Sequence, residues 1–168
     1  VAVAAGEGVQ ELFKSMGVTT IINGGQTMNP STEDILAAVK EAHAEKVIVL
    51  PNNKNILMAA NQAAEVSEDA EVAVVASRTI SEGLSSLLAF NPQASLEENK
   101  EAMTEQLSLV TSGQITNAVR DTSIDGVDIK ENDFMGIVNG KILISVPDRK
   151  QATIDTIAKM VNEESEIL

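Results

Sequence analysis

The sequence predicts an α/β protein: a parallel β-α-β sheet of about four units, then a smaller antiparallel β element and a C-terminal helix. Short apolar runs alternate with helix patterns up to residue 92, which is the rhythm of parallel strands joined by helices. Residues 46–50 read as a β-branched strand covered on both faces. Asn139 and Gly140 separate two apolar runs, which is a hairpin signal. We therefore divide the chain into 1–92, the parallel part, and 93–168, a helix, a hairpin-rich part and a last helix, within one compact piece.

The first part is expected to alternate strands and helices. The predicted strands are 1–5, 20–22, 46–50 and 71–76. The turn at residues 6–8 opens the first helix, and Gly17 ends it. Ser31 or Thr32 caps the second helix and Asn55 the third, while the fourth begins at residues 81–83.

The second part begins where Asn91 and Pro92 break the pattern. Ser95 and Glu98 have the spacing of a capping box at a helix start. Strand patterns follow at 113–119, 124–129, 134–138 and 141–145, the second of them an alternating run. The last helix is predicted from the apolar residues Ile154, Ile157, Ala158 and Val161.

Composition limits the function. The net charge of -13 argues against nucleic acid and anionic membrane surfaces, and it fits a cytoplasmic protein or one with a basic partner. The absence of cysteine excludes disulfides, thiolate metal sites and a cysteine nucleophile, and a single histidine excludes a multi-histidine metal site. No run approaches the ~20 apolar residues of a membrane span. Both ends of the sequence read as cuts in a longer polypeptide.

Polar loops follow three predicted strands, at residues 23–34, 51–55 and 77–79. Because the carboxyl ends of parallel strands meet at one edge of a sheet, we expect ligand or partner contacts there. The candidate ligand- or partner-binding residues are Gly24, Gly25, Gln26, Thr27, Asn29, Ser31, Thr32, Asn52, Asn53, Asn55, Arg78 and Thr79.

The chemistry of these loops leaves two interpretations open. Amides and hydroxyls beside a helix N-terminus suit a carboxylate or phosphate, although Glu33 and Asp34 oppose a strongly anionic ligand. Alternatively, the loop side chains satisfy their own backbone. Arg78 is placed to meet a phosphate or an acidic partner. Because Asn52 and Asn53 lie in a loop, their joint replacement by Ala is expected to leave the fold intact.

The sequence contains no complete catalytic or nucleotide-binding motif of the common types. Gly6 and Gly8 resemble the start of a dinucleotide fingerprint, but Glu11 stands at the third glycine position. Neither a Walker A motif nor a Gly-x-Ser-x-Gly motif occurs. We therefore assign no catalytic and no metal-binding residue.

Four blocks carry a family resemblance: residues 24–34, 49–55, 88–92 and 118–122. They closely resemble the C-terminal region of the ATP-binding subunit of bacterial fatty acid kinase, which is a dihydroxyacetone-kinase-like protein with a DAK2 (DhaL-type) domain. The resemblance covers essentially the whole chain and implies a DegV-like fold. The family holds ATP and magnesium in an N-terminal domain outside this sequence, so no cofactor is expected here. This piece alone is not expected to be a kinase, although its parent resembles an ATP-dependent fatty acid kinase.

The resemblance implies an accessory domain that supports phosphorylation of fatty acids by docking a fatty-acid-binding DegV-like protein. It leaves a homodimer open as a second assembly. The alternative function is a small-ligand domain of DegV type, binding a fatty acid or another carboxylate in its aliphatic interior. A free-standing enzyme is a third alternative. Lipid released from the denatured protein would distinguish ligand binding from docking.

Overall fold

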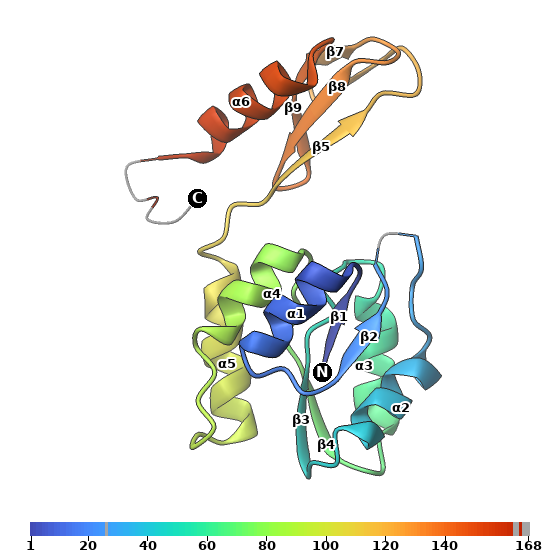
Figure 1. Ribbon diagram of the computed structural model, residues 1–168, viewed down its shortest axis with the longest axis vertical. Helices are drawn as coiled ribbons and strands as arrows, with labels where there is room; N and C mark the ends of the chain where they lie inside the picture. The colour runs from blue at the N-terminus through green and yellow to red at the C-terminus, as the bar shows by residue number, and fades with distance from the viewer. Residues whose placement is uncertain (26, 163–164, 166–168) are drawn as a thin grey trace. The chain divides into compact units, whose positions relative to one another are not determined.

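The computed structural model describes residues 1–25, 27–162 and 165, and the chain falls into two compact units, Val1–Val110 and Thr111–Leu168 (Figure 1). The division predicted from sequence falls after residue 92. Helix α5 (Leu96–Leu107) follows that point but packs on α4 (Ile80–Leu87), so it is part of the first unit.

The first unit contains two pairs of parallel strands. Its other elements are β1 (Ala2–Ala4), α1 (Glu7–Ser15), β2 (Ile21–Asn23), α2 (Thr32–Glu41), β3 (Lys46–Val49), α3 (Leu57–Val66) and β4 (Glu71–Val74). β1 pairs with β2 and β3 pairs with β4, both in parallel. A parallel bridge between Ala2 and Leu50 joins the pairs, so the strands lie in the order β2-β1-β3-β4. The predicted parallel β-α-β part is confirmed.

Helices cover both faces of these strands. Ile35 of α2 and Ala60 of α3 belong to one buried cluster with Val49. Phe13 of α1 and Met103 of α5 belong to a second cluster, against which α4 also packs. Because side chains alternate between the faces of a strand, one short strand serves both clusters. The core is aliphatic except for Phe13, as the low aromatic content predicts.

Two of the predicted helix starts need correction. Ser31 caps α2 as expected, but the N-cap of α3 is Ile56, without a side-chain cap, and not Asn55. α4 begins before residue 81 because Thr79 is its N-cap and accepts a hydrogen bond from the Glu82 backbone. A residue type that favours capping therefore predicts the start of a helix only where that residue immediately precedes the first helical turn.

The second unit is an antiparallel sheet with one helix. Its elements are β5 (Gly113–Asn117), β6 (Thr122–Ile124), β7 (Val127–Ile129), β8 (Phe134–Val138), β9 (Lys141–Val146) and α6 (Arg149–Met160). β5, β8 and β9 form one sheet in that order, and β6 and β7 form a separate hairpin. The predicted hairpin at Asn139 and Gly140 is confirmed, with φ of 48° and 83°.

One predicted strand is wrong. Residues 124–129 alternate in polarity, but they do not form one strand: they comprise the last residue of β6, a two-residue turn and β7. Asp125 and Gly126 occupy the turn with φ of 55° and 79°. Both residue types tolerate this left-handed backbone, so Asp-Gly makes a two-residue hairpin loop. The turn signal outweighs the alternation on either side of it.

The apolar pattern that predicts α6 is not the face that α6 buries. Ile154 and Ile157 are 51% and 37% exposed, whereas Ala152 and Thr156 are buried. A Cβ at Gly136 of β8 would overlap the Thr156 hydroxyl, so the helix lies very close to the sheet. Only small side chains fit such a contact. Among the helices that the structure describes, none has the length and apolarity needed to cross a membrane.

Candidate functional site

The strand order of the first unit defines a switch point. From β1 the chain moves outward to β2, and it then returns to place β3 on the other side of β1. In open α/β sheets, ligands bind outside the carboxyl ends of the strands at such a point. Residues 51–55 follow β3 there, while residues 24–30 follow β2 and residues 75–79 follow β4. The structure therefore places the three polar loops at the same edge.

Asn52 fills the switch point. Its side-chain nitrogen donates to the Val3 carbonyl at 2.9 Å, and its side-chain oxygen accepts from the Ser77 hydroxyl at 2.7 Å. The Asn52 backbone N–H also donates to the Ser77 hydroxyl, at 3.1 Å. Asn52 is only 6% exposed and has a φ of 55°, a conformation that asparagine tolerates better than most residues. The expectation that Asn52 lies outside the core is therefore wrong.

Helix α4 closes over Asn52. A Cβ at Gly83 would overlap the Asn52 amide oxygen, so glycine permits the helix to approach this closely. The start of the helix is fixed nearby, where the Arg78 backbone donates to Glu82 Oε2 at 2.6 Å. Sequence reasoning placed Ser77 in the third polar loop but not among the contact residues, and it missed Gly83 as part of this edge. A glycine inside a helix pattern was the available signal, since it often marks a close packing contact.

The loop after β2 is compact. Gly25 N–H donates to the Met28 carbonyl at 2.9 Å, and a Cβ at Gly24 would lie 2.9 Å from that same oxygen. Thr27 and Asn29 are exposed. Gln26, which sequence analysis included in the site, lies outside the described residues. Two of the predicted contact residues therefore present their polar groups to solvent, while the glycines shape the loop.

Ser31 is occupied with the helix that it caps. Its hydroxyl accepts from the Asp34 backbone at 3.2 Å, and its own backbone donates to Asp34 Oδ2 at 2.9 Å. Hydrogen bonds from the Ser31 backbone and then the Ser31 hydroxyl lower the pKa of the Asp34 carboxyl. A carboxylate of the chain itself thus lies at the N-terminus of α2, where an anionic ligand would bind. At Ser31, the interpretation that the loop side chains satisfy the hydrogen bonds of their own backbone is confirmed.

The remaining predicted residues divide between local contacts and solvent. Thr32 donates to Gln62 Oε1 at 3.0 Å and so ties α2 to α3. The Asn53 side chain accepts from the Asn55 backbone at 2.9 Å within one turn. The Asn55 and Arg78 residues are exposed. Among the predicted site residues that the structure describes, the solvent-facing polar groups are therefore hydroxyls, amides and one guanidinium.

The residues at this edge divide into buried ones at the switch point and exposed ones around it. The crevice is filled by Asn52, Ser77 and the α4 backbone, while Thr27, Asn29 and Arg78 remain exposed around it. Within the described part of the chain, no group of three or more His, Cys, Asp or Glu residues is arranged to hold a metal ion.

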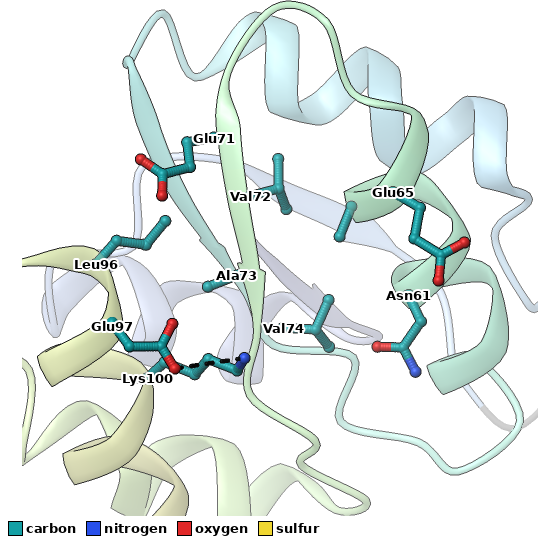
Figure 2. A pocket seen from close by; sticks show the side chains of 10 residues that line it. Asn61, Glu65, Glu71, Val72, Ala73, Val74, Leu96, Glu97 and Lys100 are labelled. Carbon is teal, nitrogen blue, oxygen red and sulfur yellow. Dashed lines mark ion pairs between the residues drawn. The ribbon is translucent and has the colours of Figure 1, made fainter.

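Two cavities of the first unit lie away from this edge. One, of about 380 Å³, is mostly apolar and lies toward the amino ends of the strands; its lining includes Met16, Val18, Leu87, Phe90 and Met103. The other, of about 340 Å³, is a groove along β4 between α3 and α5 (Figure 2). Sequence reasoning anticipated an aliphatic interior that could open into an acyl tunnel, but it located neither cavity.

Comparison with known proteins identifies the family. The model of the FakA-like C-terminal family, which describes the C-terminal region of fatty acid kinase subunits of the A-like type, matches residues 1–168. Protein YloV of Bacillus subtilis is 51% identical over all 168 residues, which are 30% of its length. Uncharacterized proteins of Staphylococcus saprophyticus and Staphylococcus aureus are 49% and 48% identical over the whole chain, again 30% of each. The chain spans less than a third of these relatives, and it belongs to the FakA-like C-terminal family of fatty acid kinase.

Proposed function

We propose that this chain is the accessory domain of a fatty acid kinase subunit, and that it docks a fatty-acid-binding protein of DegV-like fold that presents the acyl substrate. ATP and magnesium would be held elsewhere in the parent protein. The family match over every residue supports the accessory role. A DegV-like architecture of the chain itself is part of the same proposal.

One observation favours docking over small-ligand binding at the carboxyl edge. Asn52 fills the crevice where a small ligand would bind, and its amide is hydrogen-bonded to Val3 and Ser77. Around it, Thr27, Asn29 and Arg78 offer exposed polar groups. A protein surface can meet such groups without entering the crevice, and interface rims commonly have this polar character.

The test is calorimetric titration of the 168-residue chain with a purified, lipid-loaded DegV-like protein from the same cell, without ATP. Saturable binding is expected, with weaker affinity for Asn29→Ala and Arg78→Ala. Arg149→Ala is the matched control because it removes an exposed arginine from the second unit. Equal losses for Arg78→Ala and Arg149→Ala would indicate general charge attraction. A folded chain that does not bind would contradict docking, and sedimentation at increasing concentration would then test the homodimer.

The second candidate function is binding of a fatty acid or another apolar carboxylate. The cavity of about 380 Å³ favours it, because its lining includes Leu87, Phe90 and Met103. If this cavity binds a lipid, denaturing the protein should release it and mass spectrometry should detect it. Leu87→Trp should abolish that lipid, whereas Leu88→Trp, at a position 71% exposed and outside the lining, should not.

A further inference from the structure

Strand β4 forms an open edge of the parallel strands. It pairs with β3 on one side, and in the order β2-β1-β3-β4 it is the last strand. The Glu71 backbone donates to Glu45 at 2.9 Å and the Val75 backbone donates to Val49 at 3.1 Å, both toward β3. Because successive backbone groups of a strand alternate in direction, the N–H and C=O groups of Val72 and Val74 point away from β3.

These outward groups lie in the groove between α3 and α5. Figure 2 shows β4 running through it, with Asn61 and Glu65 on the α3 side and Leu96, Glu97 and Lys100 on the α5 side. The groove has a volume of about 340 Å³. It therefore exposes strand backbone between two helices, which is the setting in which extended segments add to a sheet.

The rim of the groove is acidic. Glu65, Glu71 and Glu97 line it, together with one lysine, Lys100. Lys100 lies 3.8 Å from Glu97 and is thereby already paired with a carboxylate. The surplus of negative charge favours an occupant that carries lysine or arginine. It also opposes pairing of β4 with β4 of a second copy, because the two acidic rims would face each other.

We infer that the β4 groove binds an extended basic segment of another polypeptide, which adds to the sheet as a fifth strand through the backbone of Val72 and Val74. Its lysine or arginine side chains meet Glu65 and Glu71 at the rim. The inference does not rest on the docking function proposed above, because it uses a different edge and a different kind of contact.

The test uses a capped synthetic peptide of about seven residues in which lysine alternates with valine. Amide hydrogen exchange of the 168-residue chain is followed by NMR with and without this peptide. The amides of Val72 and Val74 are expected to exchange fast in the free protein and to become protected by the peptide. The amides of Ala73 and Val75, which face β3, are expected to be protected in both states.

Two control peptides separate backbone pairing from charge. A peptide with glutamate in place of lysine should not bind, because the rim repels it. The lysine peptide with every backbone nitrogen methylated keeps the charge but loses its strand donors in either register, so it should protect neither Val72 nor Val74.

Protein variants give a second readout. Val72→Pro removes one outward N–H without removing a bond to β3, so it should weaken peptide binding about tenfold. Val72→Ala is the matched control, since it shortens the side chain but keeps the N–H, and its affinity should stay within about twofold. If the proline variant does not fold, the amide hydrogen exchange experiment on the unaltered chain still tests whether a peptide pairs with β4.

Three results would overturn the inference. Protection of Val72 and Val74 without peptide would mean that another part of the chain or a second copy covers the edge. Equal binding of the N-methylated peptide would reduce the site to charge attraction. If the lysine peptide neither binds nor protects these amides, the β4 groove is not a binding site for a basic segment.

Discussion

The side-chain amide of Asn52 donates a 2.9 Å hydrogen bond to the carbonyl of Val3, although 49 positions separate the two residues in the chain. The bond links the end of β3 to β1, the neighbouring strand across the switch point. The residue most central to the predicted site therefore holds the strands together, and only the exposed residues around it remain in our proposal as partner contacts.

Asn52→Ala is expected to destabilise the chain by about 2–4 kcal/mol. The variant leaves the Val3 carbonyl and the Ser77 hydroxyl without this partner, and alanine is poorly suited to a φ of 55°. Urea unfolding measures the change. Asn53→Ala is the control and should cost less than about 1 kcal/mol, because Asn53 only braces an exposed turn. Similar stability of the Asn52 variant and the unaltered chain would show the network to be dispensable.

Gly83→Ala should cost about 1–3 kcal/mol, because the added Cβ would overlap the Asn52 amide oxygen. Gly8→Ala provides the contrast: its Cβ meets nothing within 4 Å, so it should gain about 0.5–1 kcal/mol from helix propensity. In an Asn52→Ala background the Gly83 substitution should cost less, since the overlapping atom is gone. A double-mutant cycle measures this coupling, and strict additivity would argue against the contact.

Acid should weaken the two capping boxes. Bonds from Ser31 lower the pKa of Asp34, and bonds from Ser95 lower the pKa of Glu98. Since each folded-state pKa lies below its unfolded value, the stabilisation is present above the unfolded pKa and is lost as pH falls through the folded one. The melting temperature should therefore drop below about pH 4.

Asp34→Asn should make that acid-induced drop in melting temperature shallower, because the variant removes one titrating cap. Glu33→Gln removes a carboxylate from the same first turn but outside the capping box, so it controls for net charge. Identical pH profiles for the Asp34 variant and the unaltered chain would indicate that other groups control the acid response.

Asn139→Ala should destabilise the second unit more than Asn132→Ala, by about 1 kcal/mol. Both asparagines have a left-handed backbone, with φ of 48° and 70°, so that strain is common to both variants. Asn139 additionally accepts from the Ser112 backbone at 2.9 Å and so fastens the hairpin to the chain before β5. Chemical unfolding measures the difference, and equal losses would assign the whole effect to backbone conformation.

Features encoded by neighbouring residues could be predicted from the sequence. The caps at Ser31 and Ser95 and the hairpin at Asn139 each depend on residues a few positions apart. The turn at Asp125 carries an equally local signal, but the alternation of the residues around it favours a single strand, which is why the prediction fails there.

Features set by distant contacts could not be predicted in this way. Asn52 is buried because Val3 and Ser77 come to it from 49 and 25 positions away. The buried face of α6 is chosen by Gly136 on a strand, which makes Thr156 a better fit than Ile154. For the candidate site, the sequence located the polar edge, but it did not separate residues that fill the crevice from those exposed to solvent.

The two units differ in how far apart along the chain their contacts lie. In the second, tight turns join β6 to β7 and β8 to β9, so partners meet after short loops close. In the first, β1 has a strand on both sides only after Ala2 pairs with Leu50, which lies far along the chain. Since chains rich in local contacts fold faster, the second unit is expected to gain structure first during refolding, while the parallel strands with their open β4 edge assemble later.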